Sequence, residues 1–329
     1  MKINVISESE FFPKGHGVHT AYLNHVAMLK KLNIEVITNS LKKADVVHIE
    51  TIGPFGLYKL LSSPKTVVSA HIIPASFEGS LAGTRYWLGS AKKYLRFFYN
   101  KANLVLAVAP KVKSELEKMG VKQRIEILPN PIDTLVFRND EKLRILGRKH
   151  FGLNKDDRVI LSVGQVQPRK GIKDFIKIAQ ELPELTFIWV GNQPFGALTR
   201  QSEELQQLLK FPPKNFISVG GVPYSRMPQV YNAADIFLFP SYQENASMSI
   251  IEAASCGLPL VLRDLAEYQL LYKEGYLACS NNKEFKENIL GLFSDKKLFE
   301  KQSKESFNLA QKFSYEALGS RLLEYYQNL

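Results

Sequence analysis

The chain has 329 residues, of which 45% are hydrophobic and 23% charged, and its formal net charge is +11. This length and composition predict two domains, each with a core of ordinary size. Two cysteines, Cys256 and Cys279, are too few for a disulfide framework, so we expect buried thiols in a reducing compartment. Met1–Val5 reads as a strand rather than a signal peptide, and no apolar run is long enough to span a membrane. We therefore expect a cytoplasmic protein.

Short β-branched runs alternate with longer amphipathic stretches along the chain. The expected strands are 3–7, 35–38, 46–49, 66–70, 104–108 and 124–127, then 159–163, 185–190, 216–219, 236–239, 259–262 and 275–278. Helical spacing marks 20–32, 84–101, 111–119, 172–181, 205–209, 226–233 and 248–254. Apolar strands separated by helices are typical of parallel sheets covered on both faces.

Two such series predict an α/β protein with two doubly wound domains. We place the first domain at 1–148 and the second at 149–311, with the charged stretch Glu141–Leu153 around the boundary. Residues 312–329 are expected to form a C-terminal helix that packs back on the first domain. Because parallel sheets bind ligands beyond the carboxyl ends of their strands, we expect the site in a cleft between the domains.

The positive charge is concentrated in the first half of the chain. Residues 1–150 contain 23 Lys and Arg against 12 Asp and Glu, whereas the remainder contains 20 of each kind. This asymmetry predicts an acidic partner for the first domain, either an anionic membrane or a nucleic acid, and simple solubility charge is the alternative.

The segment 84–101 mixes cations with aromatic residues. The candidate membrane or acceptor residues in it are Arg85, Trp87, Lys92, Lys93, Arg96, Phe97 and Phe98. A basic amphipathic helix with Trp and Phe is typical of a membrane interface. A helix that faces the core with a solvated basic face is the alternative. Nucleic-acid binding is disfavoured because no recognition motif accompanies the basic residues.

In each series, a loop with candidate phosphate-binding residues follows the first strand. Gly15 and Gly17 allow a backbone to approach a phosphate or a sugar closely, although a plain turn has the same composition. Gln165, Arg169 and Lys170 follow the strand 159–163, and two cations before a helix suit a diphosphate. A solvated basic turn is the alternative there.

Glu244 lies in a polar loop after an apolar run, and Glu252 stands eight positions further on, a spacing that returns two side chains to nearly one helix face. The small residues between them, Ala246, Ser247 and Ser249, leave the backbone accessible where the helix begins. A helix start offers free N–H groups and the positive end of the dipole. This segment therefore predicts a nucleotide-sugar site, with the anion at the helix start and hydroxyls on the carboxylates.

His71 ends the fourth expected strand, where a histidine can act on a developing charge or a hydroxyl. A structural histidine is the alternative. The histidines and cysteines show no ligand spacing, so we expect no metal. No P-loop and no nucleophile elbow is present.

These motifs resemble a known family. PSYQENASMSIIEAASCGLPLV resembles the E-x7-E signature of retaining GT-B glycosyltransferases of family 4. VGQVQPRKGI, ILPNPID and GHGVHT resemble its phosphate loop, interdomain segment and N-terminal glycine loop, so the resemblance covers nearly the whole chain. It implies two Rossmann-like domains with an interdomain cleft, and a metal-independent transfer from a nucleotide sugar with no cofactor.

The resemblance also implies roles for single residues. Glu244 contacts hydroxyls of the donor sugar, and Glu252 holds the ribose. Lys170 pairs with the phosphates, and with Arg169 it stabilises the departing diphosphate. His71 lies beside the donor sugar and the reacting centre. Retention then proceeds by attack on the same face or through a short-lived ion pair.

Backbone groups complete the implied donor site. Amides at Asn245, Ala246 and Ser247 face the diphosphate, and the glycines at positions 15 and 17 border the diphosphate or the acceptor. Two positions depart from the family pattern. Gln165 stands where many relatives carry Arg, so Arg169 is the candidate replacement. The segment 245–247 lacks the glycine and aromatic that are commoner there, which leaves the choice of donor sugar open.

The N-terminal half, in FFPKGHGVHTAYLNHVA and DVVHIETIGPFGLYKLL, resembles glycolipid glycosyltransferases of Gram-positive bacteria. Those enzymes add a second hexose to monoglucosyl-diacylglycerol, giving lipoteichoic-acid anchors and bilayer lipids. The resemblance implies UDP-glucose or UDP-galactose as donor, α-glucosyl-diacylglycerol as acceptor, and a peripheral place on the anionic inner face of the cell membrane. A soluble or cell-wall (teichoic) polymer acceptor is the first alternative, and a non-catalytic nucleic-acid-binding protein is a remote one.

Overall fold

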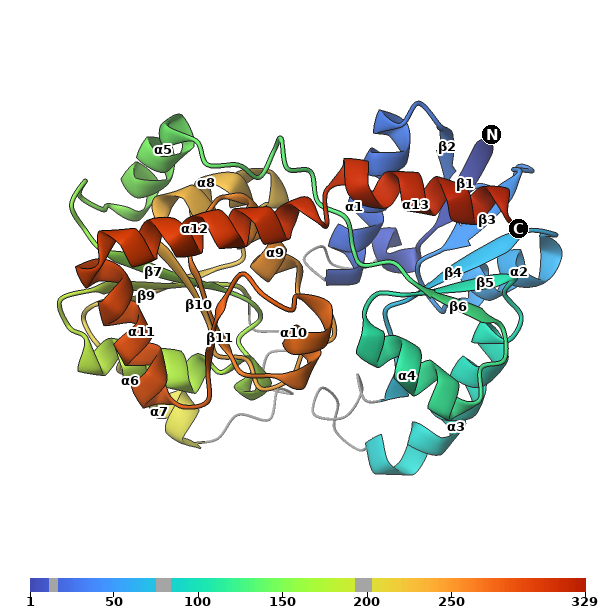
Figure 1. The fold of residues 1–329 in the computed structure, drawn as a ribbon. Coiled ribbons are helices and arrows are strands. Elements are labelled where there is room, and N and C mark those ends of the chain that lie inside the picture. The colour runs from blue at the N-terminus through green and yellow to red at the C-terminus, as the bar shows by residue number, and fades with distance from the viewer. Residues whose placement is uncertain (12–16, 75–83, 193–202) are drawn as a thin grey trace. The chain divides into compact units, whose positions relative to one another are not determined.

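A computed structural model describes residues 1–11, 17–74, 84–192 and 203–329. The chain forms two compact units: Met1–Asp133 together with Phe313–Leu329, and Thr134–Lys312 (Figure 1). Each unit is built around its own parallel sheet of six strands. The two units are described in turn below.

The first unit has the strand order β2-β1-β3-β4-β5-β6. Its strands are β1 (Lys2–Ile6), β2 (Glu35–Thr38), β3 (Val46–Ile49), β4 (Thr66–Ala70), β5 (Leu104–Ala107) and β6 (Arg124–Ile127). Its α-helices are α1 (Gly17–Lys31), α2 (Pro54–Ser62), α3 (Thr84–Tyr99), α4 (Pro110–Met119) and α13 (Tyr315–Gln327). The central strands β3, β4 and β5 are buried along their whole length, as expected of a parallel sheet covered on both faces.

The second unit has the strand order β12-β11-β10-β7-β8-β9. Its strands are β7 (Val159–Val163), β8 (Thr186–Val190), β9 (Phe216–Gly220), β10 (Ile236–Phe239), β11 (Leu260–Arg263) and β12 (Leu277–Cys279). Its α-helices are α5 (Glu141–Phe151), α6 (Ile172–Glu181), α7 (Glu203–Lys210), α8 (Met227–Ala233), α9 (Met248–Ser255), α10 (Ala266–Leu271), α11 (Asn282–Ser294) and α12 (Lys296–Gln311).

All twelve expected strands are present, and their bounds lie within two residues of the predicted ones. The α/β class with two doubly wound domains is thereby confirmed. Both cysteines are free and buried, as the composition indicated. In each sheet the strand order reverses next to the first strand, between β1 and β3 in the first unit and between β7 and β10 in the second. The loops that follow these strands are therefore neighbours at the carboxyl edge, where ligands bind in such sheets.

The division between the units differs from the predicted boundary at 148/149. The charged stretch that we placed around the boundary is α5, which packs on α8 of the second unit. Arg144 and Arg148 of α5 form ion pairs with Asp235 at 2.6 and 3.0 Å, and the Asp235 carboxylate also accepts the Val159 N–H at 2.8 Å. The charges of the stretch thus fasten a helix to the start of β7.

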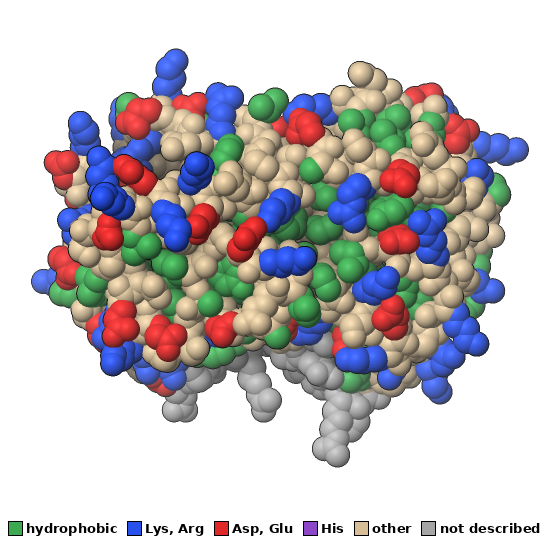
Figure 2. Space-filling view, viewed as in Figure 1, with side chains coloured by type: hydrophobic (Ala, Val, Ile, Leu, Met, Phe, Trp, Pro, Cys, Tyr) green, Lys and Arg blue, Asp and Glu red, His purple; other side chains and the backbone are tan. Residues whose placement is uncertain are grey.

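The new division also changes the charge balance. The first unit contains 19 Lys and Arg against 12 Asp and Glu, a net charge of +7. The second unit contains 24 against 20, a net charge of +4. On the face that Figure 2 shows, Lys and Arg side chains lie among acidic ones over both units. The asymmetry is therefore weaker than the division by halves indicated.

The C-terminal helix α13 is part of the first unit, where it contacts α1. The Tyr315 hydroxyl donates to Asn24 Oδ1 at 2.6 Å, and the Tyr326 hydroxyl lies 2.5 Å from His48 Nδ1. Both tyrosines and His48 are buried. Helix α13 is thus fixed by buried polar contacts at each of its ends.

The Asp235 ion pairs generate a stability prediction. Asp235→Ala should lower the free energy of unfolding by about 3 kcal/mol, because it leaves the buried Arg148 guanidinium without its carboxylate. Chemical denaturation followed by circular dichroism measures the change. Asp156→Ala, at an exposed position three residues before β7, is the matched control and should change the value by less than about 0.5 kcal/mol. Equal effects of the two substitutions would contradict the assignment.

Candidate functional site

The loops after β7 and β10 meet through a buried ion pair. Lys170 Nζ, at the end of the loop after β7, lies 2.5 Å from Glu244 Oε1, and the Ser241 hydroxyl donates to the same oxygen at 2.6 Å. Glu244 is 7% exposed. The predicted phosphate-loop cation and the first glutamate of the pair therefore lie together, and they offer a donor for phosphate oxygens beside an acceptor for hydroxyls.

Burial shapes the electrostatics of Lys170. Removal from water lowers the pKa of its ammonium, an effect that Glu244 opposes and Arg169 reinforces. The Phe239 ring, 5.4 Å from Nζ, supplies a further favourable contact for the cation. The low dielectric around Lys170 strengthens its attraction to an anion, and the Glu244 carboxylate offsets part of that attraction.

A glycine allows the close approach of the two loops. Gly171 has φ +75°, and a Cβ at this position would lie 2.1 Å from the carbonyl oxygen of Pro240. Any side chain there would push the loops apart. The conformation also lies in the left-handed region that favours glycine. Gly171 is therefore the residue that permits the Lys170–Glu244 contact.

Arg169 is bound into the loop that carries Glu244. Its carbonyl oxygen accepts the Tyr242 N–H at 2.8 Å and the Ser241 hydroxyl at 3.1 Å, and its Nη1 donates to the Gln243 carbonyl at 3.3 Å. Its Nε is buried without a hydrogen-bond partner among the described residues. Gln165 lies half-buried in the same loop. The phosphate-binding roles of both side chains stay predictions.

A second ion pair supports the loop that follows β10. Arg263 at the end of β11 pairs with Asp174 of α6 at 2.5 Å, and its Nε donates to the Pro240 carbonyl at 3.0 Å. The Tyr242 hydroxyl donates to the same Asp174 carboxylate at 2.5 Å, while its ring centroid lies 3.9 Å from the Arg263 guanidinium. Sequence reasoning missed these residues because no motif marks them.

Glu252 lies in α9, where it is 4% exposed. The Tyr231 hydroxyl of α8 donates to its Oε2 at 2.5 Å. Burial raises the pKa of Glu252 to about 7, although hydrogen bonds from Tyr231 and Tyr224 oppose the rise. At neutral pH this carboxyl is therefore poised between its neutral and ionised forms.

Glu244 and Glu252 do not lie on one helix face, so the prediction from their spacing is wrong. Helix α9 begins at Met248, with Ser247 as its N-cap, so Glu244 lies in the preceding loop and only Glu252 is helical. The two carboxylates do not share one helix face. Lys170 holds Glu244 and Tyr231 holds Glu252.

The start of α9 retains the features expected of an anion site. Ser247 has an extended backbone and its side chain makes no capping hydrogen bond; its hydroxyl instead lies 2.9 Å from that of Ser249. Asn245, Ala246 and Ser247 are half-buried. The first N–H groups of α9 are thus not capped by a serine side chain, which is the condition for binding an anion.

In the first unit His71 lies directly after β4 and contacts Glu50, which directly follows β3. Its Nε2 is 2.7 Å from Glu50 Oε2, and His25 Nδ1 of α1 is 2.5 Å from Oε1. His48 Nε2 is 3.4 Å from the same oxygen. Sequence spacing did not reveal this cluster, because three separate elements bring its members together.

The remaining predicted residues differ in whether the structure describes them and in how exposed they are. Gly15 lies outside the described residues, as does the Arg85 side chain, whereas Gly17 is the first residue of α1. On α3, Trp87 is half-buried, Phe97 is 45% exposed, and the cations Lys92, Lys93 and Arg96 are exposed.

The prediction of Phe98 as a membrane residue is wrong. Its side chain is fully buried against Tyr94 and Tyr99, because it lies on the apolar face of α3 that packs on the unit. Among the described residues, no helix combines the length and the hydropathy that a membrane crossing requires.

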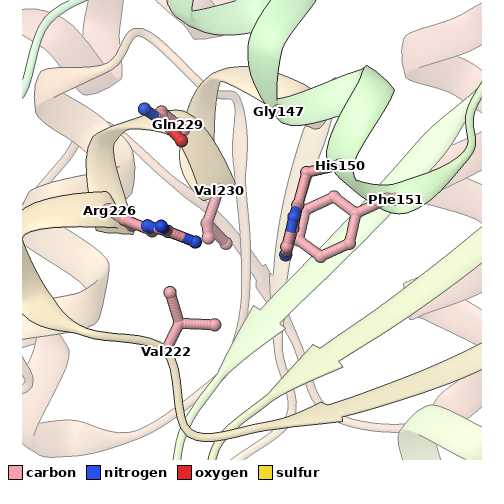
Figure 3. A pocket seen from close by; sticks show the side chains of 7 residues that line it. All are labelled: Gly147, His150, Phe151, Val222, Arg226, Gln229 and Val230. Atoms are coloured by element: carbon pink, nitrogen blue, oxygen red, sulfur yellow. The ribbon is translucent and has the colours of Figure 1, made fainter.

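A small pocket in the second unit lies apart from these groups. It is lined by Gly147, His150, Phe151, Val222, Arg226, Gln229 and Val230, on the side of α8 that faces α5 (Figure 3). Neither Lys170, Glu244 nor Glu252 lines it. We assign it no role in the site.

Comparison with known proteins identifies both parts of the chain. Residues 7–135 match the family described as Glycosyltransferase Family 4, and residues 145–309 match Glycosyl transferases group 1. The α-galactosylglucosyldiacylglycerol synthase of Streptococcus pneumoniae is 34% identical over 99% of this chain and 89% of its own length. The processive diacylglycerol α-glucosyltransferase of Acholeplasma laidlawii is 30% identical over 100% of this chain and 98% of its own.

Solved structures show the same fold. The Anabaena protein Alr3699/HepE, solved in complex with UDP-glucose, aligns with a TM-score of 0.78 at 18% identity over the full length of both chains. Sucrose-phosphate synthase of Thermosynechococcus elongatus aligns with a TM-score of 0.80 at 15% identity, over 99% of this chain and 98% of its own. With two matching family models and two relatives similar over its whole length, the chain belongs to the group 1, family 4 glycosyltransferases of the GT-B fold.

Proposed function

We propose that this glycosyltransferase transfers a hexose from a UDP-sugar to a membrane glycolipid, with retention of the anomeric configuration. The favoured acceptor is α-glucosyl-diacylglycerol, and the product is a diglycosyldiacylglycerol. The observation that carries the donor half is the Lys170–Glu244 pair at the strand-order reversal of the second sheet. The acceptor half rests on the activities for which the two full-length relatives are named.

In this proposal the diphosphate binds where a cation and a helix start converge. Lys170 and the backbone amides just before α9, at Asn245, Ala246 and Ser247, stabilise the charge that develops as the diphosphate departs. Arg169 and Gln165 lie in the same loop as Lys170 and supply further contacts. Gly15 and Gly17 border the diphosphate or the acceptor. No metal is assigned to the site.

The carboxyl groups bind hydroxyls. Glu244 accepts from donor-sugar hydroxyls and Glu252 from the ribose, and both are already held by partners that fix their positions. His71 lies beside the donor sugar. Because Glu244 is engaged by Lys170 and Ser241, we assign it to binding rather than to covalent attack. Retention then follows from attack on the face that the diphosphate leaves, directly or through a short-lived ion pair.

A lipid acceptor is favoured over a polymer because the lipid glycosyltransferases match a larger share of this chain. A putative teichuronic acid glycosyltransferase of Bacillus subtilis, TuaC, is 29% identical over only 57% of this chain, whereas both lipid glycosyltransferases match along the whole of it. Nucleic-acid binding has no support in the family. Since one relative is named for a galactosylglucosyl product and the other as a glucosyltransferase, UDP-glucose and UDP-galactose remain the two candidate donors.

We propose that the enzyme acts as a peripheral protein on the cytoplasmic face of the cell membrane. The exposed cations Lys92, Lys93 and Arg96 of α3, with the exposed Phe97, form a surface suited to anionic lipids. The net charges of the two units differ less than those of the two halves of the chain. Helix α3 is therefore the main support for this proposal.

The activity is tested directly by incubating the protein with α-glucosyl-diacylglycerol and either UDP-glucose or UDP-galactose, followed by mass spectrometry of the lipids. One donor should give a dihexosyl lipid. Lys170→Gln should reduce the rate by about 100-fold or more, because it removes the buried cation beside the leaving group. A product from a soluble or polymeric acceptor, with none from the lipid, would refute the acceptor assignment.

The raised pKa of Glu252 predicts pH-dependent donor binding. Ribose hydroxyls donate to the ionised carboxylate, so binding should strengthen as pH rises through the pKa of about 7 and weaken below it. Between pH 6 and 8 the affinity for UDP-glucose should rise about tenfold. Isothermal titration with UDP-glucose is preferred to UDP, whose terminal phosphate titrates in this range.

Glu252→Gln is the control for this titration. The variant should bind UDP-glucose more weakly at pH 8, and its affinity should be nearly constant across the range. A variant that keeps the pH dependence of the native protein would show that another group is responsible.

Membrane binding is tested by co-sedimentation with vesicles of anionic phospholipid at moderate salt. Lys92→Ser/Lys93→Ser should weaken binding by about 30-fold, since each cation near such a surface contributes about 1 kcal/mol. Lys296→Ser/Lys297→Ser removes two exposed cations from α12 and is the charge-matched control. Equal loss in both double variants would indicate attraction by net charge alone, and would remove α3 from the proposal.

A further inference from the structure

The cluster around Glu50 contains more than the binding proposal uses. Glu50 is 2% exposed, and the side chains of His25 and His48 are 1% and 0% exposed. The carboxylate receives His25 on one oxygen and His71 on the other, while His48 lies beside the first. One buried carboxylate thus joins a predicted site histidine to two histidines deep in the first unit.

The protonation of Glu50 fixes the direction of these hydrogen bonds. Burial alone would raise the pKa of Glu50, but the neighbouring histidines, His25 foremost, hold it well below its usual range. An ionised carboxylate only accepts hydrogen bonds. His25 must therefore donate from Nδ1 and His71 from Nε2. A neutral His71 that donates from Nε2 keeps its lone pair on Nδ1.

The geometry is that of a hydrogen-bonded cluster and not of a metal site. His25, His48 and Glu50 have the residue types and proximity that a divalent ion needs. However, two ligand atoms of a tetrahedral zinc site with bonds of about 2.0–2.1 Å lie about 3.3 Å apart. His48 Nε2 lies 3.4 Å from Glu50 Oε1, but His25 Nδ1 is only 2.5 Å from the same oxygen, which is the length of a hydrogen bond.

An outer set of contacts holds the carboxylate in place. Burial lowers the pKa of His48 to about 4, so this ring is neutral at pH 7. Its Nε2 lies 2.7 Å from the Ser69 hydroxyl and its Nδ1 lies 2.5 Å from the Tyr326 hydroxyl of α13. His48 is therefore fixed from β4 and from the C-terminal helix, and it limits the movement of Glu50.

We propose that Glu50 is a positioning residue, which holds His71 as the Nε2–H tautomer so that Nδ1 accepts a hydrogen bond from a sugar hydroxyl. The step that involves a sugar rests on the proposed function. The tautomer itself does not, because it follows from the contacts of the free protein. In the opposite tautomer Nδ1 would carry the proton. It would then donate to the sugar hydroxyl, and the hydroxyl would have to turn its own hydrogen away.

The tautomer can be measured on the full chain labelled with 15N-histidine. At pH 8 the 15N shifts of His71, assigned by their loss in His71→Gln, should be those of a neutral ring protonated at Nε2. In Glu50→Gln the amide can donate as well as accept, so the Nδ1–H form should become populated. A His71 ring protonated at Nδ1 in the native protein would overturn the proposal, whatever the variants do.

Transfer assays separate positioning from a purely structural effect. Glu50→Gln should lower kcat by about 10- to 100-fold, the range found when outer partners of functional histidines are removed. The double variant Glu50→Gln/His71→Gln should be no slower than His71→Gln alone, because Glu50 acts through His71. Losses that multiply in the double variant would overturn the proposal.

Tyr326→Phe is the matched control, since it removes a buried hydroxyl from the far side of the cluster without touching the Glu50–His71 contact. It should keep the native tautomer of His71 and a near-native rate. Stoichiometric zinc in the purified protein, lost in Glu50→Gln, would also overturn the proposal. If native protein showed the expected tautomer but no transfer to any lipid, the proposed function would fail and the positioning of His71 would stand.

Discussion

The donor half of the molecule depends on the contact between the loops that follow β7 and β10. Their strands are neighbours because the strand order reverses at β7, so the chain brings together segments that are about seventy residues apart in sequence. Gly171 permits the approach, and Lys170 and Glu244 close it with a buried ion pair. A side chain at position 171 would separate the Lys170 ammonium from the Glu244 carboxylate, the two groups on which the proposed donor site depends.

The surroundings make this contact rigid before any ligand binds. Asp174, Arg263 and Tyr242 hold the loop after β10 through a buried ion pair, a stacked ring and a hydrogen bond to the Pro240 carbonyl. A buried ion pair adds little net stability, because desolvation offsets most of the attraction between the charges. Its value here is in geometry: a loop held at several points presents Glu244 in one position, which reduces the ordering needed when a sugar binds.

The sequence was sufficient for the two sheets, because buried parallel strands are written as short β-branched runs with helices between them. It also marked Lys170, Glu244 and Glu252 as candidate site residues, because they lie in local motifs. It could not identify Glu50 with His25, or Asp174 with Arg263, because these partners come from separate elements and no spacing relates them. The error at Phe98 has a related cause: composition showed an amphipathic helix, but only packing shows which aromatic residues face the core. Likewise the charges of α5 indicated a domain boundary, whereas the structure pairs two of them with Asp235 in the second unit.

Three buried carboxyl groups differ in their hydrogen-bond partners. Glu50 is surrounded by histidines, which hold its pKa low, so it only accepts hydrogen bonds. Glu252 has tyrosine hydroxyls as its resolved partners, and these stabilise the anion too weakly to offset burial, so its pKa is raised to about 7. Glu244 has a lysine and a serine within hydrogen-bond distance of one oxygen. Burial alone would make the three groups alike; their partners instead keep Glu50 an acceptor, leave Glu252 with a raised pKa, and pair Glu244 with the Lys170 ammonium.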